Sequence, residues 1–349
     1  MSTFLLYGAN GYTGRLIARE AVVRGLRPVL AGRNAEAVGT LARQLGLEKR
    51  IFSLDDAAAT RAGLEGVQAV LHCAGPFAHT ARSMVDACLE ARVHYLDITG
   101  EISVFESVAA RDTEAMAAGI LLLPGAGFDV VPSDCLAAHL YRRLPAAKHL
   151  ALAFHGLGRF SRGTATTIVE NLHEGGVVRR GGALVSVPPA WQTREINFGE
   201  GPRLAVTIPW GDVSTAYRST GVGDIEVYTA VSRGQLRFMR LSRRLAWALR
   251  SSLVQNFLKR RIQARPTGPS DEERARGRTY LWGEVDDGQG RRAVSRLRGP
   301  EGYTFTMLTA LAAMTRVLAG EAPPGYQTPS LAYGPDFVLE MPGVERVDE

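Results

Sequence analysis

Phe4-Leu5-Leu6-Tyr7-Gly8-Ala9-Asn10-Gly11-Tyr12-Thr13-Gly14 decides the fold of the first part of this 349-residue chain. A short apolar run, Thr3–Tyr7, predicts a buried parallel strand. It leads into three glycines with the spacing GxxGxxG, and a helix is expected to begin near Arg15. In a dinucleotide-binding loop the first glycine allows a sharp turn, the second lets the backbone approach a pyrophosphate, and the third lets helix and strand pack closely. We therefore predict such a loop here.

The N-terminus of the following helix supplies the other half of this predicted site. Backbone N–H groups there have no intrahelical partners, and the helix dipole favours negative charge, so phosphates bind readily. A glycine-rich turn without a ligand is the alternative for an isolated motif, but five further strand-helix repeats favour the nucleotide. The loop residues expected to contact it are Gly8, Asn10, Gly11, Tyr12, Thr13 and Gly14.

Strand and helix patterns alternate up to about residue 132, which is typical of a parallel sheet with crossover helices. Each predicted strand is a short apolar run closely followed by Gly, Asp or Pro. After Thr3–Tyr7 these runs are Arg27–Ala31, Arg50–Leu54, Ala69–Cys73, His94–Ile98 and Ile120–Leu123. The fold class is therefore α/β, with an N-terminal Rossmann doubly wound parallel sheet.

The end of the second predicted strand indicates which nucleotide binds. NAD enzymes usually place an acidic residue here for the ribose 2′-hydroxyl, but this chain has Arg33 and Asn34. A guanidinium suits a 2′-phosphate, so NADP(H) is favoured over NAD(H). The alternative for Arg33 is a surface position at a helix start. After the third strand, Asp55 or Asp56 is expected either to flank the adenine or to cap a helix.

The fourth and later strand ends predict the crevice in which the cofactor lies. After the fourth strand, small residues let the cofactor approach the backbone, and Phe77 is expected to bound the nicotinamide. The residues of this segment are Cys73, Ala74, Gly75, Pro76 and Phe77. The fifth and sixth strand ends add Tyr95, Asp97, Thr99, Gly100, Glu101, Gly125, Gly127 and Asp129. Asp97 and His79 are candidate proton-exchanging residues. The alternatives are a loop-fixing hydrogen bond for Asp97 and a helix cap for His79.

A second, α+β domain with largely antiparallel strands is expected after about Pro132, followed by a helix over Thr304–Leu318 and a tail that returns to the first domain. We expect a Rossmann domain over 1–132, a substrate domain over 133–302 and a returning segment over 303–349. The predicted strands of the second domain are Ala183–Val187, Arg203–Ile208, Asp224–Val231, Thr279–Asp286 and Arg292–Arg298.

The stretch 236–264 combines apolar residues at helical spacing with eight Arg or Lys and no acid. Its apolar positions are Phe238, Leu241, Leu245, Leu249, Leu253 and Phe257. One interpretation is a core or homodimer seam with a solvated basic face. The other is a lid or a peripheral membrane contact whose arginines, including Arg243 and Arg244, meet lipid or carrier phosphates.

Composition narrows the classes of partner, metal site and cellular location that remain. The net charge of +6 could attract phosphates, but basic and aromatic residues are not interleaved as a nucleic-acid surface would require, so no nucleic acid is expected. Three cysteines without CxxC spacing predict reduced thiols and no metal site. The first residues lack the features of a signal peptide, and no apolar run is long enough to cross a membrane. A cytoplasmic protein is expected.

Four motifs of the first domain together resemble the saccharopine dehydrogenase-like oxidoreductase family. They are Gly8–Gly14, Gly75-Pro76-Phe77, Tyr95-Leu96-Asp97-Ile98-Thr99-Gly100-Glu101 and Gly125-Ala126-Gly127-Phe128-Asp129. Further on, Trp210-Gly211-Asp212, Ser219-Thr220-Gly221 and Gln327-Thr328-Pro329 resemble the branch of trans-acting enoyl reductases. The set of charged groups that would hold amino-acid carboxylates in a saccharopine-forming enzyme is not identified here.

The resemblance implies a Rossmann domain, an inserted α/β domain, a returning C-terminal segment and NADPH as reductant. The reaction expected is reduction of an activated C=C (enoyl) or imine group of a small-molecule or carrier-bound acyl substrate of the lipid or polyketide type. Tyr217 is a further candidate proton donor, from the second domain. The alternative function is a non-catalytic NADP-binding sensor or scaffold, because a Rossmann fold does not by itself imply chemistry.

Overall fold

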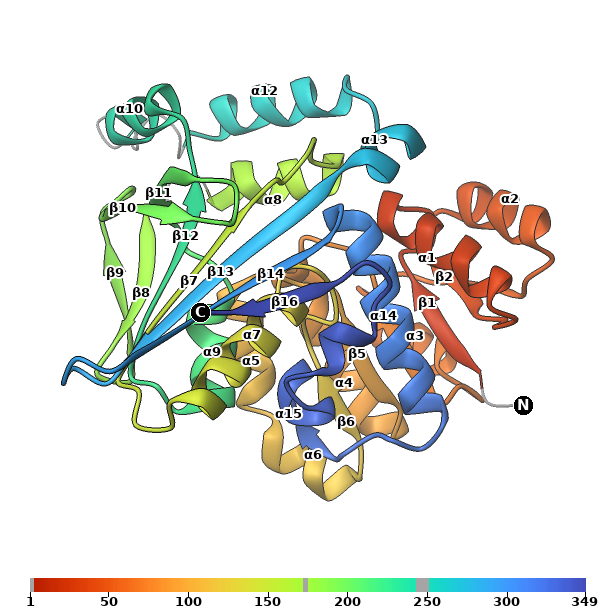
Figure 1. Cartoon of the computed structure of the whole chain (residues 1–349). Coiled ribbons are helices and arrows are strands. Elements are labelled where there is room, and N and C mark those ends of the chain that lie inside the picture. The colour runs from red at the N-terminus through yellow and green to blue at the C-terminus, as the bar shows by residue number, and fades with distance from the viewer. Residues whose placement is uncertain (1–2, 172–174, 243–250) are drawn as a thin grey trace. The chain divides into compact units, whose positions relative to one another are not determined.

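The computed structural model describes residues 3–171, 175–242 and 251–349 (Figure 1). The chain forms two compact units. Met1–Val131 and Tyr303–Ala332 make the first, whereas Pro132–Gly302 and Tyr333–Glu349 make the second. The polypeptide therefore passes from one unit to the other three times.

The first unit contains a parallel sheet whose strand order is β15-β6-β5-β4-β1-β2-β3. Within the described residues its strands are β1 (Phe4–Tyr7), β2 (Val29–Gly32), β3 (Lys49–Ile51), β4 (Ala69–His72), β5 (His94–Asp97), β6 (Leu121–Leu123) and β15 (Gly325–Tyr326). The order reverses between β1 and β4. In a doubly wound sheet such a reversal opens a crevice at the carboxyl ends of the strands, where ligands bind. This confirms the predicted fold class.

Helices cover both faces of this sheet because right-handed crossovers in opposite directions place them on opposite sides. They are α1 (Tyr12–Val23), α2 (Ala35–Leu45), α3 (Ala57–Gly63), α4 (Phe77–Ala91), α5 (Ile102–Ala109), α6 (Asp112–Ala118) and α14 (Gly302–Leu318). One buried cluster joins strand residues such as Leu5 and Val70 to Met84 of α4 and Val104 of α5. On α4 that face carries Ala81, Met84, Val85 and Cys88, at spacings of three and four typical of one helix side.

The six strands predicted for this unit are all present, and their observed bounds lie within three residues of the predicted ones. The seventh, β15, was not predicted, because two residues carry no periodicity. Tertiary contacts define it instead. It pairs with β6 through Gly325 opposite Leu121, and the Tyr326 N–H donates to Oδ1 of Asp112 over 2.7 Å.

The second unit contains a mixed sheet of order β10-β11-β12-β7-β13-β14-β16, in which β8 also pairs with β12, and β9 pairs with β8. Its strands are β7 (His149–His155), β8 (Gly176–Arg180), β9 (Ala183–Val187), β10 (Thr193–Asn197), β11 (Pro202–Thr207), β12 (Asp224–Ala230), β13 (Arg278–Asp286), β14 (Arg292–Pro300) and β16 (Glu345–Asp348). The five predicted strands are present. The four other described strands, β7, β8, β10 and β16, were not predicted. The central β7 pairs with β12 in parallel and with β13 in antiparallel orientation.

Helices of the second unit include α7 (Val131–Arg143), α8 (Arg162–Asn171), α9 (Asp212–Thr220), α10 (Arg233–Ser242), α12 (Ser252–Gln263) and α13 (Asp271–Arg276). Helix α15 (Pro329–Tyr333) belongs to the first unit up to Ala332. Helix α7 lies against β13 so closely that a Cβ on Gly283 would be 2.6 Å from Cδ1 of Leu140. Helix α12 runs along α8 (Figure 1), where Nζ of Lys259 is 2.6 Å from Oε1 of Glu170.

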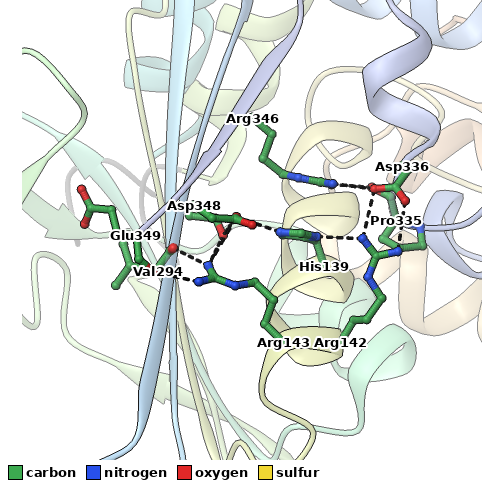
Figure 2. A network of polar contacts seen from close by, with 10 residues as sticks. His139, Arg142, Arg143, Val294, Pro335, Asp336, Arg346, Asp348 and Glu349 are labelled. Carbon is green, nitrogen blue, oxygen red and sulfur yellow. Dashed lines mark hydrogen bonds and ion pairs between the residues drawn. The ribbon is translucent and has the colours of Figure 1, made fainter.

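The segment expected to return to the first domain, 303–349, differs from the structure in its second half. Tyr303–Ala332 belongs to the first unit, but Tyr333–Glu349 belongs to the second, since β16 pairs with β14. The polar network in Figure 2 adds to this pairing. His139 of α7 is bonded to Asp348 over 2.8 Å, and Asp336 accepts from Arg142 and Arg346. These two guanidiniums lower the pKa of Asp336 to about 2.

The basic stretch 236–264 contains α12 and all but the first three residues of α10. Residues 243–250, with Arg243, Arg244, Leu245 and Leu249, lie outside the described residues. Leu236 is buried with Ala190 and Val206, as a core position would be. Phe238 and Phe257 are instead 66% and 58% exposed. Among the helices that the structure describes, none is long and apolar enough to span a membrane.

Candidate functional site

The loop between β1 and α1 is built around glycines that have no room for side chains. Gly8 has φ +81, and a Cβ there would be 2.8 Å from the backbone N of Ala74. A Cβ on Gly14 would be 2.4 Å from the backbone oxygen of Gly8. Gly8 therefore allows the turn, and Gly14 allows helix and loop to approach closely. Both roles are those predicted for the GxxGxxG motif.

The first turn of α1 faces this loop. Gly11 is the N-cap residue, no side chain caps the helix there, and the first turn carries no acidic residue. The Arg15 side chain donates from Nε to the backbone oxygen of Asn10 over 3.0 Å, which fixes the loop from the helix side. Uncapped helix N-termini bind phosphates through backbone N–H groups. A Cβ on Gly11 would have only the backbone oxygen of Gly8 nearby, at 3.2 Å, so the loop is open at this residue and fits the pyrophosphate of a dinucleotide.

At the end of β2, Arg33 is exposed, and its positive charge lowers the pKa of Tyr7 although burial raises it overall. The neighbouring Asn34 is the N-cap of α2, where its side chain accepts the N–H of Ala37 over 2.9 Å. The structure therefore gives Asn34 a capping role, while Arg33 presents its guanidinium to solvent at the strand end. This is the position at which a 2′-phosphate would be bound.

The two aspartates after β3 have different surroundings. Asp56 is the N-cap of α3 and accepts the N–H of Ala59 over 2.9 Å, which is the capping alternative considered from the sequence. Asp55 is exposed and accepts from the Ser53 hydroxyl over 2.9 Å. Its charge raises the pKa of Tyr7, whereas that of Arg33 lowers it. Asp55, rather than Asp56, is thus the carboxylate left for an adenosine contact.

The segment after β4 begins with Cys73, whose thiol is kept protonated because burial raises its pKa. The Gly75-Pro76 bond is cis. At the start of α4 the backbone N–H groups of Phe77 and Ala78 donate to the two carboxylate oxygens of Glu101, over 2.7 and 2.9 Å. A side-chain carboxylate therefore occupies the N-terminus of α4. An anionic ligand is expected to bind at the N-terminus of α1 instead. The sequence did not predict this role of Glu101.

Asp97 is fully buried at the end of β5. Its Oδ2 accepts the Tyr95 hydroxyl over 2.6 Å, and its Oδ1 accepts the N–H groups of Thr99 and Gly125 over 2.9 and 2.8 Å. Burial raises the pKa of the carboxyl to about 6, while these donors oppose the shift. Asp97 thus joins the loops that follow β5 and β6. This arrangement corresponds to the loop-fixing alternative for Asp97.

Asp129 lies beside the same loops. A Cβ on Gly100 would be 2.9 Å from Oδ2 of Asp129, so only glycine leaves space for this carboxyl. Burial, and then the charge of Glu101, raise the pKa of Asp129 to about 7. The group therefore exists partly in its protonated, proton-donating form near neutral pH. Its motif, Gly125–Asp129, was recognised from the sequence, but its altered proton affinity was not.

The two other candidate proton donors lie in different surroundings. His79 is exposed in the first turn of α4, where its N–H donates to the oxygen of Pro76 over 3.2 Å. Tyr217 belongs to α9 of the second unit, and the Arg179 guanidinium carbon lies 4.1 Å from its ring centroid. Among the described residues no group of three or more His, Cys, Asp or Glu could hold a metal ion.

The loop-fixing role of Asp97 predicts a difference between two variants. Asp97→Ala leaves three buried donors without an acceptor and should lower the free energy of unfolding by roughly 2–5 kcal/mol. Asp97→Asn can accept the two backbone N–H groups and donate to Tyr95, so a loss below about 1.5 kcal/mol is expected. Urea unfolding measures both. Asp55→Asn, on the surface, is the control, and an Asp97→Ala protein as stable as the unaltered chain would contradict the role.

Comparison with known proteins agrees with this geometry. Residues 4–123 match the family described as Saccharopine dehydrogenase NADP binding domain. A trans-acting enoyl reductase of Mycobacterium leprae (strain TN) is 33% identical over 148 residues, 40% of this chain. One of Mycobacterium tuberculosis (strain ATCC 25618 / H37Rv) is 33% identical over 147 residues. The match covers 35% of the length of each of these relatives.

The fold of the whole chain also has a solved counterpart. Apo saccharopine dehydrogenase (L-Glu forming) from Saccharomyces cerevisiae superimposes with a TM-score of 0.68 over 100% of both chains, at 12% sequence identity. At that identity the likeness establishes the fold. The family match confirms NADP(H) as the nucleotide expected at the glycine loop. The first domain of this chain, residues 4–123, thus resembles the saccharopine dehydrogenase NADP-binding domain family.

Proposed function

We propose that the protein is an NADPH-dependent oxidoreductase that reduces the activated C=C bond of an enoyl substrate. The observation that carries the proposal is a dinucleotide loop at the same sheet edge as Asp129, whose carboxyl has a pKa near neutrality. The similarity to trans-acting enoyl reductases supports an enoyl group over an imine. A small-molecule or carrier-bound acyl chain of the lipid or polyketide type is the substrate class that follows.

Reduction of an enoyl thioester requires a hydride at the β carbon and a proton at the α carbon. The glycine loop would hold NADPH, which would supply the hydride and leave as NADP⁺. We assign the proton to the carboxyl of Asp129, because the proton must come from a group still protonated near pH 7. Asp97 then acts as a positioning residue, since both of its oxygens are engaged in holding the loops. His79 and Tyr217 are the alternative proton donors, and substituting each residue in turn distinguishes them from Asp129.

The reaction is tested by following NADPH absorbance with crotonyl and longer enoyl thioesters. Turnover is expected, with the rate falling as pH rises through about 7, because deprotonation removes the proton that Asp129 delivers. Asp129→Asn should lower kcat by roughly 10²- to 10⁴-fold while NADPH binding is retained. His79→Gln and Tyr217→Phe are the comparison variants. A larger loss in either than in Asp129→Asn would contradict the assignment.

NADPH binding without turnover on enoyl or imine acceptors would instead support the alternative, a non-catalytic sensor or scaffold. Because a Rossmann fold does not by itself imply catalysis, nucleotide binding without turnover is a distinct outcome. In that case the raised pKa of Asp129 would have no catalytic meaning, and a protein partner would be sought.

Arg33 is proposed to bind the 2′-phosphate that distinguishes NADPH from NADH. It stands exposed at the end of β2, where an acidic residue would bind the NAD ribose. We expect NADPH to bind at least about tenfold more tightly than NADH, and Arg33→Ala to lose about 1.4 kcal/mol or more of this preference. Nicotinamide fluorescence titration measures both affinities. Arg24→Ala, which removes an exposed arginine at the other end of α1, should leave the preference unchanged.

We further propose that α10 and α12 make a peripheral contact with an anionic membrane, which would bring a lipid-type substrate to the enzyme. Neither helix contains an acidic residue, and both present an exposed phenylalanine among arginines. Phe238 stands between Arg237 and Arg240, and the guanidinium carbon of Arg261 lies 5.6 Å from the ring centroid of Phe257. Aromatic and basic side chains on one helix are typical of interfacial binding.

Flotation with phosphatidylglycerol-containing vesicles tests this contact. Binding is expected to fall with added salt and to be weaker for a Phe238→Ala, Phe257→Ala double variant, because apolar area and charge attraction both contribute. Val23→Ala, which removes an exposed apolar residue of the first unit, is the control. Equal binding to neutral phosphatidylcholine vesicles, or no binding to either, would leave a core or self-association role for these helices.

A further inference from the structure

Two tyrosines that are far apart in the sequence meet beside the dinucleotide loop. Tyr12 is the first residue of α1, and Tyr303 lies in the first turn of α14. Their ring centroids are 5.0 Å apart with an interplanar angle of 86°, an edge-to-face arrangement. Both side chains are partly exposed. The returning segment thus places an aromatic ring against the residue that directly follows Gly11 of the loop.

The position of Tyr303 is fixed by how α14 is held within the first unit. The Thr306 hydroxyl oxygen accepts the N–H of Phe128 over 3.0 Å, and the Thr309 hydroxyl donates to the oxygen of Ala126 over 2.9 Å. Gly127 has no room for a side chain, because a Cβ there would be 2.9 Å from Cγ2 of Thr306. The start of α14 is therefore held at the loop that also contains Asp129.

The exposure of Tyr303 distinguishes it from the residues that hold the helix in place. Phe305, two residues later, is completely buried, and Leu308 is 8% exposed. These side chains provide the packing of α14. Tyr303 contributes little to that core, and its ring touches Tyr12 instead. A ring at this place stabilises one orientation of Tyr12 and, through it, the first turn of α1.

We propose that Tyr303 is a positioning residue of the NADP(H) site, which holds Tyr12 so that the loop is already in its binding conformation before the nucleotide arrives. The proposal rests on NADP(H) binding at Gly8–Gly14. Fixing a loop in its bound conformation increases affinity by lowering the entropy lost on binding. The dinucleotide site then consists of the N-terminal loop and a residue of the C-terminal helix.

NADPH titration by nicotinamide fluorescence tests the proposal. Edge-to-face aromatic pairs contribute enough for Tyr303→Ala to weaken NADPH binding by roughly 2- to 12-fold. Tyr303→Phe should bind NADPH like the unaltered protein, because the ring contact needs no hydroxyl. Thr315→Ala, which changes an exposed residue of α14, should also leave the affinity unchanged.

A double-mutant cycle shows whether Tyr303 acts through Tyr12. In a Tyr12→Ala background, adding Tyr303→Ala should change the Kd for NADPH by less than about twofold, because the contact is already gone. Urea unfolding of the unliganded variants separates loss of affinity from loss of folding. Unchanged affinity in Tyr303→Ala, or an equal loss in both backgrounds, would overturn the proposal. An unaltered protein that binds no NADPH would overturn the cofactor site itself.

Discussion

The close approach of the loop after β1 to the end of β4 is the constraint on which the nucleotide site depends. At Gly8 the chain turns with positive φ, and the backbone of Cys73 and Ala74 occupies the space where a side chain would begin. Because these two strands flank the reversal in strand order, their ends define the crevice. Any larger residue at position 8 would have to separate the two strand ends, and the loop would lose its shape.

Three carboxyl groups at this sheet edge have different roles. Glu101 occupies the N-terminus of α4, and Asp97 connects the loops after β5 and β6. Asp129 is the third of them, and the charge of Glu101 helps to raise its pKa. Three acids in neighbouring loops therefore have three different roles, which follow from their hydrogen-bond donors and their distance from solvent. Burial raises the pKa of both Asp97 and Asp129, but both oxygens of Asp97 already accept hydrogen bonds, and for this reason we propose the acid-base role for Asp129.

The sequence predicted the elements that local pattern determines. The apolar runs and glycine spacing of the first domain were sufficient for its strands and for the nucleotide loop. Patterns could not reveal β15, which is defined by Asp112 and its pairing with β6. The central strand β7 was missed although His149–His155 contains an apolar run like those that predicted the other strands. Patterns also could not separate Asp55 from Asp56, because both are acidic residues after a strand. The pKa of Asp129 depends on burial by distant residues, which the order of amino acids does not display.

The arrangement of late segments has a consequence for the order in which the protein can fold during synthesis. Strand β6 of the first sheet obtains its neighbour from Gly325–Tyr326, and β14 of the second obtains its neighbour from Glu345–Asp348. Strand β6 therefore lacks its second neighbour until about two hundred more residues have been translated, and β14 lacks its second neighbour for about fifty more. Exposed strand edges pair readily with other chains. Nascent chains should thus be most prone to misassembly just before these final segments leave the ribosome, a period in which chaperones would have the greatest effect on yield.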